Sequence, residues 1–171
     1  MVQARSRSLF LLGFLVSVGT LCAAYYLEWQ VGLKPCSLCL VQRFFIAVFG
    51  LSCLAAFIHK PSPWGQRGYL LLNTLMLAGA AAAALRQLWL QANGEQPKVA
   101  CQPGLEYLLT TLPFPEAIKT LLLGTPECAR VNWTLLDMSV PEWSLLALAC
   151  LLLLTLTGWL QALLPKPSGA R

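Results

Sequence analysis

Long runs of apolar residues dominate the chain, with only a few polar connections between them. Four runs cover about residues 9–27, 38–58, 69–90 and 143–164. Each is near the ~20 residues that an α-helix needs to cross ~30 Å of hydrocarbon. Backbone polar groups in lipid must pair within their own segment, so helices are the expected form. The pattern predicts an all-α membrane protein, a four-transmembrane-helix bundle with both termini on one side.

The first apolar run has a second interpretation, because Arg5 and Arg7 precede it as in a secretory signal peptide. Its apolar stretch is longer than the ~7–15 residues usual for a signal peptide, and Cys22-Ala23-Ala24 is only a passable cleavage site. We therefore favour a retained membrane span over a cleaved leader.

Composition agrees with a chain whose outer surface faces membrane lipid. Hydrophobic residues make up 57% of the 171 residues and charged residues 11%, against roughly 25% charged residues in soluble domains. The length predicts a single four-helix membrane domain over residues 1–171. The formal net charge of +5 is too small and too scattered to indicate nucleic-acid binding.

The distribution of charge predicts the orientation of the bundle in the membrane. One side carries basic residues and no acidic ones: Arg5, Arg7, Lys60, Arg67, Lys166 and Arg171. All seven acidic residues fall on the other side, in the predicted outer loops over about 28–37 and 91–142 or at their edges. Lys and Arg in short loops mark the cytoplasmic face. Both termini are therefore expected in the cytoplasm.

The second outer loop is the longest hydrophilic part of the chain, and prolines recur through it. Because proline lacks an N–H donor, these residues exclude a long helix. A short amphipathic helix is predicted between Pro115 and Gly124, with Ile118, Leu121 and Leu122 on one face. It would lie on the membrane surface or pack on the loop's own residues, and the pattern does not choose between the two.

The seven cysteines divide by their predicted side of the membrane. Cys22, Cys53 and Cys150 fall inside apolar runs, where we interpret them as small hydrophobes of a packed bundle. The others all lie on the outer side: Cys36 and Cys39 at the start of the second run, and Cys101 and Cys128 in the long loop. Four cysteines can pair in three ways, and the sequence alone leaves all three open.

The Cys36-Ser37-Leu38-Cys39 motif carries the sharpest chemical signal. Pro35 precedes it, as at a helix start, and N–H groups at a helix N-terminus favour a thiolate, the species that attacks disulfides. Zinc binding by the four outer cysteines is an alternative. Structural disulfides are another, although a CxxC ring is too short to constrain much chain entropy. The combination favours redox exchange.

Arg43 follows Cys39 by four residues and therefore lies on the same helix face, one turn deeper in the span. A charged side chain at a helix centre in the membrane costs about 2.5–3.5 kcal/mol. Arg43 either extends to the head groups or lies beside a bound electron acceptor. Arg86 allows the same two interpretations, of which extension to the head groups is favoured.

These residues resemble a known family. The segment from Leu33 to Cys39, followed by Arg43, resembles the signature of the bacterial disulfide bond formation protein B (DsbB) family. Cys128-Ala129-Arg130, with Trp133 and Pro141-Glu142-Trp143 beyond it, resembles the stretch that leads that family into its last helix. The resemblance covers almost the whole chain.

The resemblance implies a multi-pass protein of the bacterial inner membrane whose active cysteines are periplasmic. Such proteins reoxidise a soluble DsbA-like periplasmic thiol oxidase and reduce ubiquinone or menaquinone, and a quinone is the only cofactor indicated. By position, Cys101 would form the mixed disulfide with the partner, and Cys128 would be its loop mate. Cys36 and Cys39 would receive the electrons, with Cys39 nearest the quinone and Arg43 in the quinone site.

Two other functions remain open on the sequence. One is a membrane binding or assembly protein whose outer cysteines form structural disulfides. The other is a related quinone-coupled oxidase that serves a dedicated client, since an irregular loop would determine the choice of partner.

Overall fold

The computed structural model describes residues 2–32, 35–93 and 137–163, together with residues 113, 115, 116, 119, 122, 128, 134 and 135. Within these residues the chain forms four long helices: α1 (Val2–Gln30), α2 (Ser37–His59), α3 (Pro63–Asn93) and α6 (Val140–Leu163). Each contains a span long and apolar enough to cross a membrane. The predicted four-helix membrane fold is confirmed.

The helices are longer than the apolar runs that predicted them. α1 continues to Gln30, so Glu28, expected at the start of the outer loop, is helical. α3 begins at Pro63, where a residue without an N–H donor suits the first helical position. Helical hydrogen bonding does not stop at the edge of the apolar run. The run therefore predicts the part of a helix in hydrocarbon rather than the whole helix.

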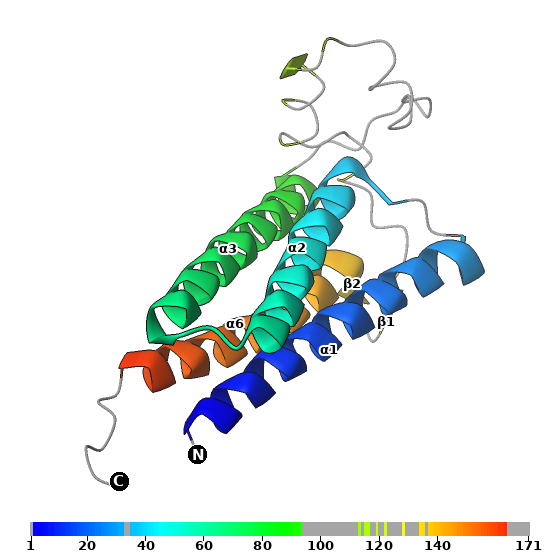
Figure 1. The fold of residues 1–171 in the computed structure, drawn as a ribbon. Coiled ribbons are helices and arrows are strands. Elements are labelled where there is room, and N and C mark those ends of the chain that lie inside the picture. Colours follow the sequence, from blue (N-terminus) through cyan, green and yellow to red (C-terminus); the bar gives the residue numbers. More distant parts are fainter. Residues whose placement is uncertain are drawn as a thin grey trace, which may run out of the picture.

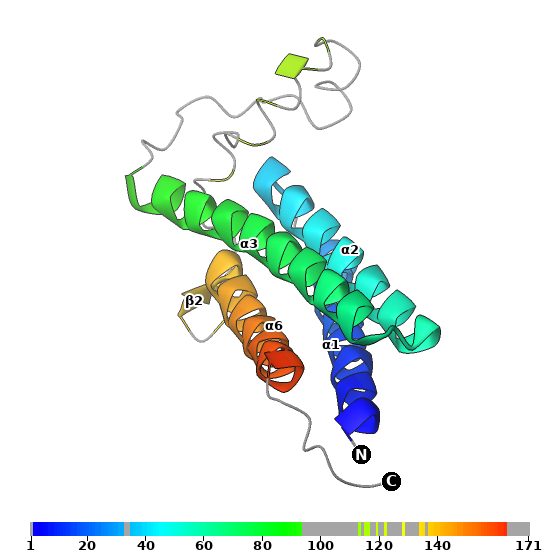
Figure 2. The ribbon, with the colours of Figure 1, turned by 60° about the vertical axis from the view of Figure 1, so that its left-hand side comes forward.

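The four helices pack in a closed ring. α2 packs against both α1 and α3, α3 packs against α6, and α6 returns to α1 (Figure 1). Figure 2 shows α3 running between α2 and α6. The start of α1, the connection between α2 and α3, and the end of α6 lie at the same end of the bundle. The start of α2 and the end of α3 lie at the opposite end, which we call the Cys36 end.

Glycines allow the helices of the ring to approach closely. A Cβ atom on Gly79 of α3 would lie 2.7 Å from the Phe45 ring of α2, and one on Gly158 of α6 would lie 2.8 Å from the Leu70 side chain. Small residues at such contacts are typical of helices packed in membranes. The buried core between the helices includes Ile46, Phe49 and Leu151.

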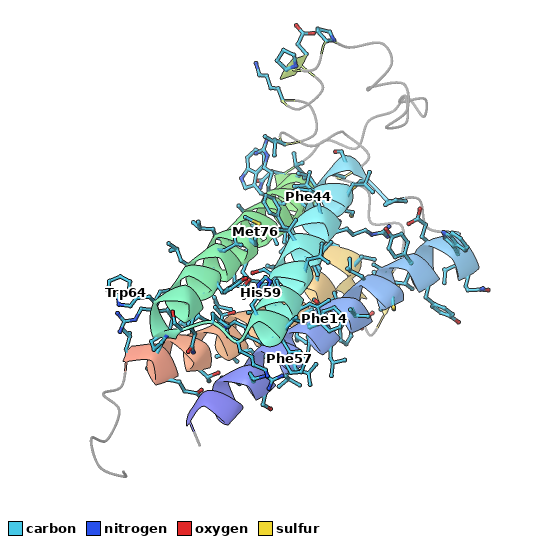
Figure 3. All side chains as sticks on the ribbon, viewed as in Figure 1. Phe14, Phe44, Phe57, His59, Trp64 and Met76 are labelled. Atoms are coloured by element: carbon cyan, nitrogen blue, oxygen red, sulfur yellow. The ribbon has the colours of Figure 1, made fainter. Side chains whose placement is uncertain are left out.

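The outward faces of the helices are apolar, as expected of a bundle surrounded by lipid. Large exposed hydrophobic side chains occur on all four helices, and Phe44 of α2 is one of them (Figure 3). Exposed Tyr26 and Trp29 fall in the last turns of α1, and exposed Trp89 falls near the end of α3, at the Cys36 end. Exposed Trp64 lies at the other end (Figure 3). Aromatic belts of this kind mark the two membrane–water interfaces.

A small hairpin leads into the last helix. β1 (Thr134–Leu135) pairs antiparallel with β2 (Met138–Ser139), and Asp137 in the turn has a φ of 61°. At the start of α6, the Ser139 backbone N–H and hydroxyl both donate to the Glu142 carboxylate. This Ser-x-x-Glu arrangement satisfies an N–H that would otherwise lack a helical partner.

The predicted short helix between Pro115 and Gly124 is described only in part. Pro115, Glu116, Lys119 and Leu122 have helical backbone, and Leu122 is exposed. Ile118, Leu121 and Gly124 lie outside the described residues.

Candidate redox site

The two cysteines of the CxxC motif meet where α2 begins. Cys36 is the N-cap residue, with an extended backbone (φ −75°, ψ 169°), and α2 starts at Ser37. Cys39 therefore lies in the first helical turn, the position that faces an N-cap side chain. Both cysteines are free thiols, and their Sγ atoms are 3.1 Å apart. The local fold of the helix start thus brings the two sulfurs into contact.

Cys128 of the long loop lies against this pair. Its side chain is only 1% exposed and clusters with Cys36, Leu38 and Ala83. The Cys128 and Cys36 thiols form a side-chain hydrogen bond, and Cys128 Sγ is 3.5 Å from the Ser37 hydroxyl. Three of the four predicted redox cysteines are therefore brought together. The fourth, Cys101, lies outside the described residues.

The sulfur cluster determines which thiol holds its proton. Hydrogen bonds to Cys128 and Cys39, together with burial, raise the pKa of Cys36. Helix-start N–H groups, which the sequence predicted would favour a thiolate at the first cysteine of the motif, are opposed here by neighbouring sulfurs and by burial. A protonated Cys36 can instead donate its S–H to Cys39, whose sulfur is in contact.

Cys39 has a second set of partners on α3. Gln87 Nε2 is 3.4 Å from Cys39 Sγ, and Gln87 Oε1 is 3.5 Å from the same sulfur. Gln42, one turn below Cys39 on α2, donates from its Nε2 to Gln87 Oε1 at 3.0 Å. Both glutamine side chains are buried. The amide pair therefore connects Cys39 to the interface between α2 and α3.

Arg43, one turn along α2 from Cys39, has its side chain held by α1 rather than by α3. Its Nη1 donates to Glu28 Oε2 in an ion pair, and its Nη2 donates to the Ala24 carbonyl oxygen at 3.1 Å. The guanidinium also lies 4.9 Å from the centre of the Tyr25 ring. Pairing with Glu28 lowers the cost of a cation inside a span. The contact with Glu28 was not expected from the sequence, which predicted for Arg43 either extension to the head groups or a position beside an acceptor.

Arg86 and the three cysteines inside the spans also have positions that can be compared with their predicted ones. Arg86 lies over the Trp89 ring at 4.6 Å, an arrangement suited to the membrane interface. Cys53 is buried and accepts a hydrogen bond from Asn73, as a core residue should. Cys22 and Cys150 are exposed, so their placement in the packed core was wrong. In a membrane helix both faces are apolar, and a cysteine does not reveal which face it occupies.

Sequence reasoning missed Gln42, Gln87 and Glu28. The available signal was polarity, since two amides within otherwise apolar spans are expensive and need partners. Ser37 was missed for another reason: it was treated only as a spacer of the CxxC motif, although its hydroxyl contacts Cys128. In the part of the chain that the structure describes, no group of three or more His, Cys, Asp or Glu side chains is arranged to hold a metal ion.

The fold and the site together define a class: a four-helix membrane protein with clustered thiols at one end of the bundle. Comparison with known proteins specifies the class further. The family model "Disulfide bond formation protein DsbB" matches residues 6–158. Disulfide bond formation protein B of Stutzerimonas stutzeri strain A1501 is 47% identical over 153 residues, which cover 86% of this chain and 94% of that protein.

Two further relatives carry the same family name. Disulfide bond formation protein B 1 of Pseudomonas aeruginosa strain PAO1 is 45% identical over 161 residues, or 94% of this chain and 99% of that protein. The Hahella chejuensis disulfide bond formation protein B is 43% identical over 142 residues, or 83% and 86% of the two chains. No solved structure matches the chain.

The chain belongs to the DsbB family of disulfide bond formation proteins. It is accordingly a multi-pass inner-membrane protein and a disulfide oxidoreductase, which confirms the resemblance noted in its sequence.

Proposed function

We propose that the protein is a thiol:quinone oxidoreductase that reoxidises a DsbA-like periplasmic dithiol oxidase. The observation that carries the proposal is the contact of three sulfurs: Cys128 hydrogen-bonds to Cys36, and Cys36 lies 3.1 Å from Cys39. Thiol–disulfide exchange requires a thiolate to reach a neighbouring sulfur. The continuous series of sulfur contacts from Cys128 of the long loop to Cys39 in the first turn of α2 meets that requirement.

The proposed electron path begins at the partner. Its two thiols reduce a Cys101–Cys128 disulfide, with Cys101 forming the mixed disulfide. Cys128 is then a thiol beside Cys36, and its thiolate attacks the Cys36–Cys39 disulfide at Cys36. This interloop step forms a Cys36–Cys128 bond and releases Cys39 as a thiolate. The partner's second thiol displaces Cys101 from the mixed disulfide and completes the partner's own disulfide. The freed Cys101 thiolate then attacks the Cys36–Cys128 bond at Cys128, which restores the loop disulfide and releases Cys36, which takes up a proton.

The second half of the reaction removes two electrons and two protons from Cys36 and Cys39. These residues regain their disulfide, and ubiquinone or menaquinone becomes the quinol, so electrons and protons balance. Cys39 would donate the electrons to the quinone, and Arg43 would contribute the cation that stabilises negative charge on a quinone oxygen. The pairing of Arg43 with Glu28 and Ala24 fixes this cation near the Cys36 end.

The topology is part of the proposal. Both termini would be cytoplasmic, and the Cys36 end would face the periplasm. The clustering of basic residues on the opposite side supports this orientation. In this proposal residues 1–171 form a single domain whose outward faces contact lipid, and this domain contains the whole electron path from the partner to the quinone.

The decisive experiment follows quinone reduction spectroscopically in the purified protein, with a reduced thioredoxin-fold protein as electron donor. We expect turnover with ubiquinone or menaquinone in the original chain and none in Cys39→Ser. Cys22→Ser is the matched control, because Cys22 is an exposed cysteine of α1, and it should retain turnover. Absence of turnover with both quinones in folded protein would overturn the proposal in favour of structural disulfides.

A further inference from the structure

Two amide side chains lie buried beside Cys39 in spans that are otherwise apolar. Gln42 on α2 is 5% exposed, and Gln87 on α3 is 4% exposed. Burial of an amide is unfavourable unless its donors and acceptors are paired. Here the two amides pair with each other and with one sulfur atom. The question is whether that sulfur is an incidental neighbour or the group that the pair serves.

The hydrogen bonds fix the direction in which the Gln87 amide points. Gln42 Nε2 donates to Gln87 Oε1 at 3.0 Å, so the oxygen end of the Gln87 amide faces Gln42. The Gln87 Nε2 group is left to donate to Cys39 Sγ at 3.4 Å. With Gln42 donating in this way, a flipped Gln87 would place two N–H donors opposite each other. Gln42 therefore orients Gln87 with its donor toward the sulfur.

This arrangement suits both protonation states of Cys39. A Cys39 thiol can donate to Gln87 Oε1 at 3.5 Å, and a Cys39 thiolate can accept from Gln87 Nε2 at 3.4 Å. A thiolate away from water needs such a donor, because hydrogen bonding to a charged form favours that form. Cys36, at 3.1 Å, supplies a second donor from the other side.

We infer that Gln87, oriented by Gln42, is a positioning residue that stabilises the Cys39 thiolate for disulfide exchange and electron release. The role of Cys39 in electron release rests on the proposed function, whereas the hydrogen bond itself does not. A purely structural role is the competing explanation, since polar pairs also hold membrane helices together. The two explanations differ in what happens to the chemistry of Cys39 when the bundle stays folded.

The test uses the reduced full-length protein and measures alkylation of Cys39 as a function of pH, with the site resolved by mass spectrometry. In Gln87→Met, which keeps the side-chain length and removes the donor, we expect the alkylation profile of Cys39 to move to higher pH. The rate at pH 7 should fall about tenfold, as loss of a hydrogen bond to a charged group predicts. Gln91→Met, one turn further along α3, should leave the profile unchanged.

Gln42→Met provides a second variant, because it removes the orienting donor and leaves Gln87 in place. It should move the profile in the same direction by a smaller amount, and it carries the test if Gln87→Met does not fold. An unchanged Cys39 profile in a folded variant would overturn the inference and leave the pair with a structural role.

Quinone turnover measured on the same preparations separates this inference from the proposed function. A shifted profile in Gln87→Met supports the inference even if the original chain reduces no quinone, an outcome that would overturn the proposed function alone. Turnover in the original chain with an unchanged Gln87→Met profile would overturn the inference alone.

Discussion

Arg43 of α2 and Glu28 of α1 form an ion pair near the Cys36 end of the bundle. The same guanidinium donates to the Ala24 carbonyl oxygen, so two groups of α1 hold it in place. A cation that acts on a bound acceptor must be held in a fixed position. The guanidinium group can be held at two points at once, because it has several N–H donors in a rigid plane. The pair therefore connects the packing of α1 to the proposed quinone site.

Glu28→Gln should weaken the interaction with quinone while leaving the thiols unaffected. The neutral amide keeps the size of the side chain but attracts the guanidinium less, so Arg43 is positioned less firmly. We expect the KM for quinone to rise about three- to tenfold, in line with the loss of a partly buried charged hydrogen bond. Steady-state quinone reduction provides the measurement.

Gln30→Glu is the control for a change of charge near the end of α1, because Gln30 is exposed. It should leave the KM unchanged. An unaltered KM in Glu28→Gln would mean that the ion pair serves only to hold α1 against α2.

Contact between Cys128 and Cys36 predicts which disulfide can be trapped. In a variant with Cys39→Ala and Cys101→Ala, the competing partners of both cysteines are gone. Mild oxidation should then form a Cys36–Cys128 bond in most molecules, because the two thiols are already hydrogen-bonded. Peptide mapping under non-reducing conditions identifies the bond. Recovery of both cysteines as free thiols would contradict the proposed interloop step.

The apolar runs were sufficient to predict four membrane helices because lipid imposes one length and one form of backbone pairing. The CxxC motif likewise predicted a contact between Cys36 and Cys39, since their spacing places both at one helix start. Local sequence could not predict that Cys128 returns to this helix start. That contact depends on how a long loop folds, and loops carry no periodic signal.

The sequence also could not predict which side chains of different helices contact each other within the membrane. Gln87 meets Cys39 only because α3 packs against α2 in one particular rotation. Likewise, Glu28 meets Arg43 only because α1 extends beyond its apolar run. The charge and amide positions were visible in the sequence, but helix rotation decides which of them face one another.

Close helix approach predicts a stability difference between two glycines of α3. Gly79→Ala would place a methyl group 2.7 Å from the Phe45 ring, so the ring or the helix must shift. Overpacking of this kind costs about 1–3 kcal/mol, and thermal unfolding in detergent should show a lower Tm. Gly68→Ala, on the same helix with nothing within 4 Å of the new Cβ, should keep or raise the Tm. Equal Tm values for the two variants would contradict the observed packing of α2 on α3.

Cys128 should control the pH at which Cys36 becomes reactive. Its hydrogen bond is the largest cause that raises the pKa of Cys36. A raised pKa means that Cys36 keeps its proton as the pH rises through the range in which an ordinary thiol ionises. Cys128→Ala removes that hydrogen bond and some burial, so the pKa of Cys36 should fall toward its ordinary value. In reduced protein, the alkylation profile of Cys36 should therefore move to lower pH, with the site again resolved by mass spectrometry.

Better access of the reagent to Cys36 would instead raise the alkylation rate by the same factor at every pH and leave the midpoint in place. A midpoint that stays fixed in Cys128→Ala would show that Cys128 does not hold the proton of Cys36 in the reduced protein.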